Sequence, residues 1–336
     1  MTEYGFINIE YDLPDAPKKT RQKMDGKTVI ELMLVTAVIG IAAFGFNKFS
    51  DLYVYLIKKT PLVDYILTSE AMYNIVQALY SIFAIMIPFL IAWLILKLIR
   101  RKDLSIPFGA PKSKSLTVAF VFFAFLTVVV SNVLVSLAAL GMEAVGFEFD
   151  IAEMPDPKSF AGYLWQVFSV ALVPAFVEEF AIRGVMLQSL RKYGDIFAII
   201  VSAIFFGLMH GNVMQAPFAF LLGMVISWAV IQTGSIWTGI IIHLLNNFYA
   251  TSLTALNVVA SSGLYIAIVA TINIVGALLG LLAIVWIVDK KRHELHIENK
   301  YRWEPYVFAV LSIPFTASLI YLAKICLETV HYVGVG

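Results

Sequence analysis

Long apolar runs, separated by short polar stretches, make up most of the chain between residues 29 and 327. A helix needs about 20 apolar residues to cross the hydrocarbon core of a bilayer, so runs of this length predict membrane spans. We therefore expect an all-α fold: a polytopic membrane helical bundle with about eight or nine transmembrane helices. The segments that qualify, or nearly do, are Val29–Phe46, Met72–Ile99, Leu116–Leu140, Tyr163–Leu190, Ile196–Met209, Val213–Ile231, Ile236–Leu256, Leu264–Val288 and Val307–Leu327.

The composition supports a membrane protein. Of the 336 residues, 60% are hydrophobic and only 14% are charged, whereas soluble domains average roughly 45–50% apolar and about 25% charged. A soluble domain could not bury this much apolar surface, and a disordered chain or a secreted disulfide scaffold is excluded as well. The single cysteine, Cys326, has no partner for an internal disulfide and lies in an apolar run, which predicts a buried, inert thiol.

Charge carries less information about partners. The 24 basic and 23 acidic residues give a net charge of +1, which predicts no nucleic-acid partner and no strong electrostatic steering. The first 28 residues are polar and lack the short basic region followed by an apolar stretch that marks a signal peptide. We expect them to form a cytosolic N-terminal tail and the first span to be retained as an anchor.

The distribution of basic residues predicts the orientation in the membrane. Basic residues gather before the first span and after the second, fourth and eighth, at Lys18, Lys19, Arg21, Lys23, Lys27, Lys97, Arg100, Arg101, Lys102, Lys112, Lys114, Arg191, Lys192, Lys290, Lys291, Arg292, Lys300 and Arg302. The loop after the third span is acidic, with Glu143, Glu148, Asp150, Glu153 and Asp156. Lys58 and Lys59 run against the pattern, but the positive-inside rule still predicts a cytosolic N-terminus.

Ionisable residues inside the apolar segments point to a functional site, because holding them in a bilayer costs several kcal/mol. They concentrate in or beside three of the four segments between Tyr163 and Leu256, which favours one shared site over scattered structural pairs. The polar and charged residues of these segments are Glu178, Glu179, Arg183, His210, His243, Asn246 and Asn247.

Helix geometry separates the two glutamates. Glu179 and Arg183 are four residues apart and share a helix face, so they can form an ion pair, while Glu178 is turned away from that pair. His243 and Asn247 have the same spacing and can project together into one cavity.

Depth along the helices brings the segments together. Glu178 lies ~21 Å before the basic residue Lys192, and His210 lies ~22 Å after Asp195 on the same side, at 1.5 Å per residue. Two antiparallel neighbouring helices would therefore hold Glu178 and His210 at similar depth.

These groups suffice for hydrolysis of an amide bond. A carboxylate can take a proton from water while a neighbouring imidazole orients that water. A second imidazole and a carboxamide can donate hydrogen bonds to the oxyanion of a tetrahedral intermediate. An alternative is a catalytic zinc ion held by Glu178, His210 and His243 with water in the fourth position. We expect no cofactor, with zinc as the alternative.

Three motifs carry a resemblance to a known family. Glu178-Glu179-x-x-x-Arg183, Phe206-x-x-x-His210 and His243-x-x-x-Asn247 follow one another along the chain, each in or at the end of an apolar segment. Between about residues 160 and 255, the chain resembles the type II CAAX prenyl endopeptidases, also called the CPBP or Abi family, which include bacteriocin-processing and immunity proteins.

The resemblance implies an all-helical fold with a water-filled catalytic cavity open to the cytosol. It implies that Glu178 activates water with the help of His210, and that His243 and Asn247 form the oxyanion hole. Glu179 and Arg183 would support this metal-independent glutamic protease site. The expected organisation is a tail (1–28), N-terminal transmembrane helices (29–158), a catalytic core (159–256) and C-terminal transmembrane helices (257–336).

The expected function is that of an intramembrane endopeptidase that cleaves membrane-associated or lipidated peptides, either in CAAX-type processing or in maturation of bacteriocins and other peptides. Its partners would be a peptide or lipidated protein and the membrane lipids. One alternative is a non-catalytic immunity or scaffold protein, and another is a proton-coupled transporter, which would use the same buried groups as a relay.

Structural explanations remain for individual residues. The charged cluster could pin helices together, and the histidines could hydrogen-bond neighbouring helices. We expect Asn246 to make such an inter-helix contact rather than to act in catalysis, and Phe206 and Trp237 to be packing residues.

Overall fold

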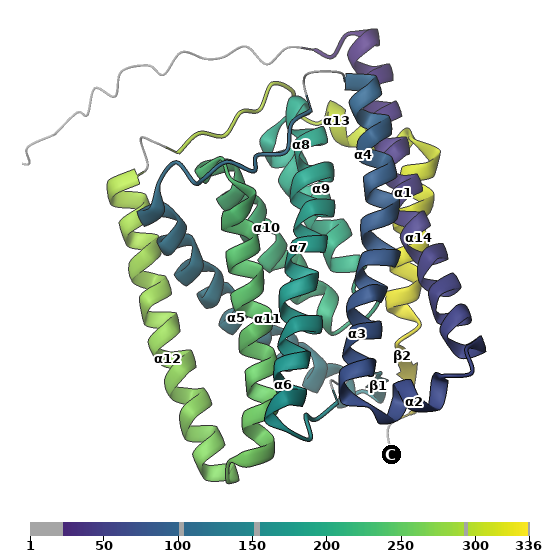
Figure 1. Cartoon of the computed structure of the whole chain (residues 1–336). Helices are drawn as coiled ribbons and strands as arrows, with labels where there is room; N and C mark the ends of the chain where they lie inside the picture. The colour runs from purple at the N-terminus through teal and green to yellow at the C-terminus, as the bar shows by residue number, and fades with distance from the viewer. Residues whose placement is uncertain (1–22, 101–103, 151–154, 292–294, 335–336) are drawn as a thin grey trace, which may run out of the picture.

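The computed structural model describes residues 23–100, 104–150, 155–291 and 295–334 (Figure 1). Most of the expected N-terminal tail, residues 1–22, lies outside this part of the chain. The regular secondary structure of the described residues is helical apart from one antiparallel pair of three-residue strands, β1 (Phe147–Phe149) and β2 (Val330–Tyr332). The predicted all-α membrane bundle is confirmed.

All nine predicted apolar segments contain helix. The helices are α1 (Gly26–Lys59), α2 (Val63–Thr68), α3 (Glu70–Ser81), α4 (Ile87–Arg100), α5 (Lys114–Glu143), α6 (Phe160–Gln166), α7 (Val173–Glu179), α8 (Gln188–Leu190), α9 (Asp195–Leu208), α10 (Gln215–Thr233), α11 (Ile236–Val259), α12 (Ser262–Trp286), α13 (Glu304–Leu311) and α14 (Ile313–Leu327). Short π-helical segments connect α3 to α4, and α6 through α7 to α8. With these segments, Glu70–Arg100 and Phe160–Tyr193 each form one long helix.

Fewer helices than expected meet the length and apolarity of a full membrane span. Six of the described helices do, and α13 and α14 would add a seventh, although they are bent by 83° at their junction. With 14 residues, α9 reaches only ~21 Å at 1.5 Å per residue. Helix α11 is long enough, but His243, Asn246 and Asn247 interrupt its apolar run. The expected eight or nine spans therefore include helices that are short, bent or partly polar.

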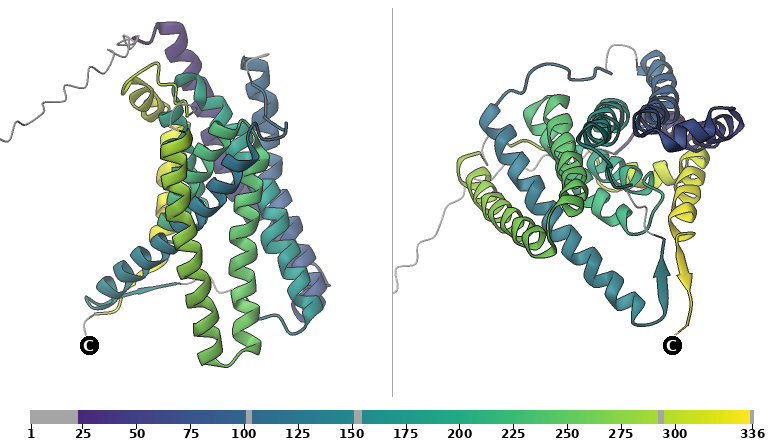
Figure 2. Two further views of the ribbon diagram at one scale, coloured as in Figure 1. Left: turned by 90° about the vertical axis from the view of Figure 1, so that its left-hand side faces the viewer. Right: turned by 60° about the horizontal axis from the view of Figure 1, so that its bottom comes forward.

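The helices with the polar motifs lie at the centre of the bundle (Figure 2). Helices α9 and α10 pack against each other and α10 also packs against α5, while α1 packs against α4 and α14. Helix α12 packs against α5 and is only 11% buried in its most apolar window, which leaves most of its surface for lipid. The core around the motif helices is thus shielded from lipid by the outer helices.

The turn between α9 and α10 is held in place by the two strands. Asn212 donates a hydrogen bond from its side chain to the carbonyl oxygen of Asp150, just after β1. The Val213 amide donates to Oγ1 of Thr329, just before β2, at 3.2 Å. The Asp150 amide in turn donates to the Thr329 carbonyl at 2.9 Å. This short sheet therefore fixes the turn in which His210 lies.

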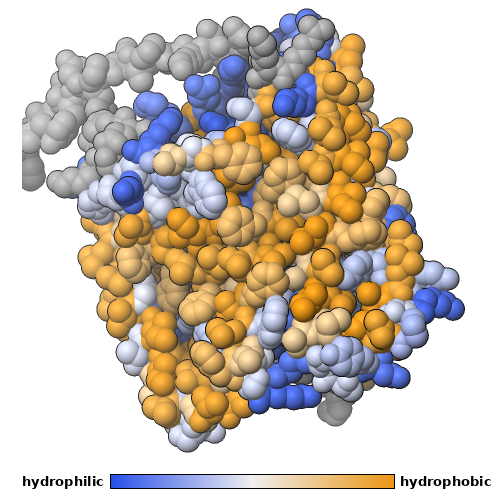
Figure 3. Space-filling view, in the orientation of Figure 1, coloured by the Kyte–Doolittle hydropathy of each residue, from blue (hydrophilic) through white to orange (hydrophobic). Residues whose placement is uncertain are grey.

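Basic residues gather at one end of the bundle, the upper end in Figure 1. There Glu31 of α1 pairs with Lys192 at 2.6 Å and with Arg100 of α4 at 3.5 Å, and Arg100 also donates to the Ser189 carbonyl. Hydrophilic residues colour this end blue in Figure 3, above a broad apolar band. We call it the basic end.

Candidate active site

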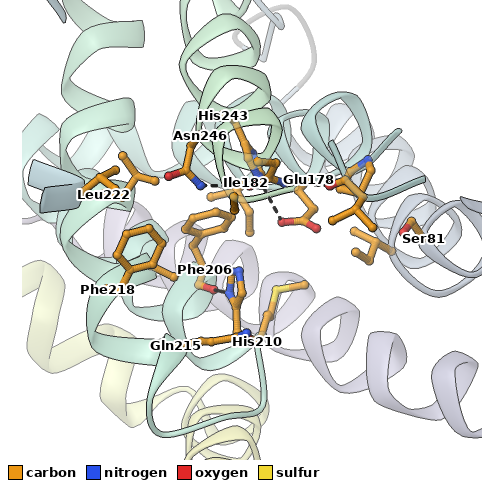
Figure 4. Close-up of a pocket in the computed structure, with 18 of the residues that line it drawn as sticks. Ser81, Glu178, Ile182, Phe206, His210, Gln215, Phe218, Leu222, His243 and Asn246 are labelled. Carbon is orange, nitrogen blue, oxygen red and sulfur yellow. Dashed lines mark hydrogen bonds and ion pairs between the residues drawn. The ribbon is translucent and has the colours of Figure 1, made fainter. Parts of the chain in front are cut away.

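The residues singled out by the motifs meet at one cavity of about 580 Å³ (Figure 4). Helices α1, α3, α5, α7, α10 and α11 and the end of α9 contribute to its lining. Five of the polar motif residues line it: Glu178, His210, His243, Asn246 and Asn247. The expectation that three apolar segments build one shared site agrees with this arrangement, and α10, which lies between the last two of them in the chain, lines the cavity as well.

The two adjacent glutamates occupy different environments. The Glu179 side chain is completely buried, and its Oε1 accepts hydrogen bonds from Arg183 Nη1 at 2.8 Å and from His243 Nδ1 at 3.0 Å. The Glu178 side chain is 21% exposed and faces the cavity, with Oε2 3.9 Å from His243 Nε2. The predicted ion pair between Glu179 and Arg183 is confirmed, and Glu178 is the carboxylate that reaches the cavity.

Local helix geometry helps to separate these side chains. Helix α7 ends at Glu179, and the next eight residues form a π-helical segment, Phe180–Leu187. Such widened turns occur mostly as single insertions in α-helices, frequently at functional sites. Here the widened turn carries Arg183, which lies one turn after Glu179.

Arg183 is fully buried, and its charge is matched on several sides. Its Nη1 donates to Glu179, its Nη2 donates to the Gly223 carbonyl of α10 at 3.1 Å, and the guanidinium lies 4.3 Å from the centroid of the Phe206 ring. A buried charge is tolerated only when it is paired in this way. Arg183 therefore couples the central helices α7, α9 and α10.

Phe206 is the packing residue that the sequence predicted, and it also positions the histidines. Its ring is 3% exposed and meets the rings of His210 and His243 edge-on, with centroids 5.1 Å and 5.5 Å away. One aromatic ring thus separates the two imidazoles and covers the guanidinium of Arg183.

Both imidazoles are oriented by hydrogen bonds at Nδ1. In His243 the Nδ1–H donates to the Glu179 carboxylate, which directs Nε2 towards Glu178. In His210, just after the end of α9, the Nδ1–H donates to the Phe206 carbonyl at 2.7 Å, so Nε2 remains for the cavity. A hydrogen bond at one ring nitrogen sets the role of the other.

The two neighbouring asparagines make different hydrogen bonds. Asn247 donates from Nδ2 to the Val170 carbonyl at 3.0 Å and so makes the inter-helix contact expected of Asn246. Asn246 donates to Oδ1 of Asn247 at 3.0 Å, on its own helix, and lines the cavity. The hydrogen bond of Asn246 thus stays on its own helix, whereas the inter-helix hydrogen bond is made by Asn247.

Comparison with protein families supports the resemblance carried by these motifs. Residues 160–249 match the family model described as Type II CAAX prenyl endopeptidase Rce1-like. The three motifs all lie within this Rce1-like segment, and the match suggests a CAAX-type intramembrane protease, a hydrolase. Comparisons with curated proteins and with solved structures gave no match.

One residue of the Rce1-like segment that contacts the site, Gly239, belongs to none of the three motifs. Gly239 of α11 packs so closely against Glu179 that a Cβ atom there would lie 2.6 Å from the Glu179 Oε2 atom. The available signal was a glycine inside an apolar helix, which often marks close approach of another group. Sequence alone could not reveal that this group is a carboxylate 60 residues earlier in the chain.

The alternative prediction is a zinc site formed by Glu178, His210 and His243, which also lie in the Rce1-like segment. Within the described part of the chain, no group of three or more His, Cys, Asp or Glu side chains is arranged to hold a metal ion. His243 directs Nδ1 at Glu179, and His210 directs Nδ1 at the Phe206 carbonyl. Glu178, His210 and His243 all line the same cavity, and the two hydrogen bonds at Nδ1 leave both Nε2 atoms unbonded.

Proposed function

We propose that this protein is an integral membrane endopeptidase in which Glu178 activates a water molecule to hydrolyse a peptide bond. The observation that carries the proposal is the contrast between the two glutamates. Glu179 is sealed against Arg183 and His243, whereas Glu178 faces the cavity beside the Nε2 atom of His243. Of these two carboxylates, only that of Glu178 is accessible to a water molecule in the cavity.

The reaction would proceed without a covalent intermediate. Glu178 takes a proton from water while Nε2 of His210 accepts a hydrogen bond from the same water molecule and orients it. The water oxygen bonds to the peptide carbonyl carbon, and the electron pair of the C=O double bond moves to the carbonyl oxygen. The protonated Glu178 then returns its proton to the amide nitrogen as the C–N bond breaks.

His243 and Asn247 would stabilise the oxyanion. Each such donor typically contributes about 10²–10³-fold in rate. In this role His243 donates from both ring nitrogens. Its Nδ1–H keeps the hydrogen bond to Glu179, and its Nε2–H donates to the oxyanion. Asn247 uses one amide proton for the Val170 carbonyl and has a second one for the oxyanion.

The membrane setting limits the substrate. Apolar side chains such as Phe46, Val128 and Phe218 make up much of the cavity lining. They favour a peptide whose apolar or lipidated part lies in the bilayer while its scissile bond enters the cavity. With the basic loops in the cytosol, the N-terminus would be cytosolic as well.

The direct test is cleavage of prenylated CAAX peptides and unmodified leader peptides by the purified protein in detergent. Glu178→Gln should lower turnover by about 10²–10⁴-fold, as expected for loss of a general base, with membrane insertion unchanged. Glu143→Gln, at the exposed end of α5, is the matched control and should cleave like the wild type.

Four outcomes would contradict the proposal. Normal turnover by Glu178→Gln would remove Glu178 as the base. Loss of wild-type activity on addition of a chelator, restored by zinc, would favour the zinc alternative. A scaffold protein would cleave none of the peptides and would keep its cellular phenotype in Glu178→Gln, while a transporter would lose substrate flux instead.

A further inference from the structure

The cavity is closed towards the basic end and open in the other direction. The lining residues on the side of the basic end, Ile182, Leu222 and Phe206, are all buried. On the other side, Gln77 of α3, Asn132 of α5 and Ala250 of α11 line the same cavity and are exposed.

Positions along the helices place this opening far from the basic end. Glu178 lies ~21 Å from Lys192 at 1.5 Å per residue. Gln77 lies ~35 Å from Arg100 on the same measure. Leu253, another lining residue, lies ~15 Å beyond His243 on α11, again away from the basic end. The cavity thus runs from the catalytic groups away from the basic loops.

The basic loops define the cytosolic face. Arg100 ends α4, Lys114 begins α5, and Arg191 and Lys192 lie between α8 and α9, so these charges meet at one end of the bundle. Lys112 belongs to the same end, where its amide bonds to the Thr233 carbonyl at the end of α10. By the positive-inside rule this end faces the cytosol.

We infer that the cavity admits its peptide from the face of the membrane opposite the cytosol. That the peptide is a substrate rests on the proposed function. The direction of entry differs from the cytosolic opening that the family resemblance implies. A cytosolic prenylated CAAX protein could not reach an opening on that face. The substrate class that fits is an exported peptide, or the exported segment of a membrane protein.

The lining at the opening fits such a peptide. Polar side chains of Gln77, Asn132 and Asn246 can hydrogen-bond to an extended peptide backbone, since each carries both donors and acceptors. The apolar residues Ala250 and Leu253 line the same side of the cavity and can contact apolar peptide side chains. The opening is thus suited to an apolar peptide entering in extended form.

Cysteine labelling tests the direction of the opening. Cys326 is the single cysteine of the sequence and is buried, so Cys326→Ser gives a background without reactive thiols. In that background, Gln77→Cys and Asn132→Cys report on the opening. Lys114→Cys marks the basic end, and Gly263→Cys marks the opposite end, where a Cβ would meet no atom within 4 Å.

A membrane-impermeant maleimide would be added to intact cells and, separately, to inverted membrane vesicles. We expect Gln77→Cys and Asn132→Cys to be labelled in intact cells, like Gly263→Cys, and Lys114→Cys to be labelled only in inverted vesicles. Labelling of the two opening positions only in inverted vesicles would overturn the inference. So would absence of labelling at both of them from either side, because a thiol facing lipid does not react.

This experiment is independent of catalysis. If Glu178→Gln kept full activity while the labelling followed the expected pattern, the proposed base would be wrong and the direction of the opening would stand. The reverse pair of results would leave the glutamate mechanism and refute entry from the non-cytosolic face.

Discussion

Glu178 and Glu179 are neighbours in the chain, but their carboxylates have opposite surroundings. A helix turns by about 100° per residue, so Glu179 shares a face with Arg183 while Glu178 points into the cavity. Their chemistry follows from this turn. Glu179 compensates a buried positive charge and orients His243, and Glu178 remains accessible to water.

Substitution of the two glutamates should therefore have different effects on stability and activity. Glu179→Gln leaves the buried Arg183 without a negative partner, which costs about 3–5 kcal/mol for a broken buried pair. We expect a clear fall in the thermal unfolding midpoint of the protein in detergent, accompanied by lower activity. Glu178→Gln should lose activity at an unchanged midpoint. Equal midpoints for the two variants would contradict the assignment of the buried pair.

Gly239→Ala tests the positioning of Glu179 without changing any charge. The new Cβ would come within 2.6 Å of Glu179 Oε2 and push the carboxylate away from His243. A misplacement of about 1 Å at a catalytic group can cost about 10²-fold, so we expect kcat to fall on that order while KM changes little. Gly263→Ala, with open space around it, is the control. An unchanged kcat in Gly239→Ala would argue against the orienting role of Glu179.

For single residues, the sequence predicted those relations that depend on one helix alone, namely which side chains share a helix face. The spacing of Glu179 and Arg183, and that of His243 and Asn247, were sufficient for their shared faces. The close approach of Gly239 to Glu179 and the position of Phe206 between two histidines depend on packing between helices. No local pattern encodes such contacts.

The element that most affects the site is the turn between α9 and α10. The apolar pattern predicted helices on both sides of this turn, and both are present. The strands that hold the turn were not predicted, because each has three residues and they pair across more than 180 positions of the sequence. Such short, non-local pairing leaves no periodicity to detect.

Thr329→Val tests whether the strands support the site. The exchange preserves the shape of the side chain but removes the Oγ1 atom, which accepts a hydrogen bond from the Val213 amide and donates one to the Cys326 carbonyl. Each such bond contributes about 0.5–1.5 kcal/mol, and we expect a several-fold lower turnover as His210 loses its fixed position. Thr271→Val, the same exchange on the exposed surface of α12, should leave turnover unchanged. Equal turnover in the two variants would show that catalysis does not depend on the strands.

The path of the whole chain across the membrane can be tested through its two ends. Helix α1 begins at the basic end, and α9 and α10 leave that end and return to it, so they do not change the side of the chain. The remaining long helices alternate in direction, and β2, after α14, lies at the opposite end (Figure 1). We therefore expect epitope tags at the N- and C-terminal ends of the sequence to lie on opposite faces of the membrane.

In intact cells the C-terminal tag should be accessible to an added antibody and the N-terminal tag should not, because the positive-inside rule predicts that the basic loops face the cytosol. This result decides between the two span counts expected from the sequence: eight crossings would bring both ends to one face, whereas nine place them on opposite faces. Two tags protected together, or exposed together, would contradict the path described here. They would also remove the orientation on which entry of an exported peptide depends.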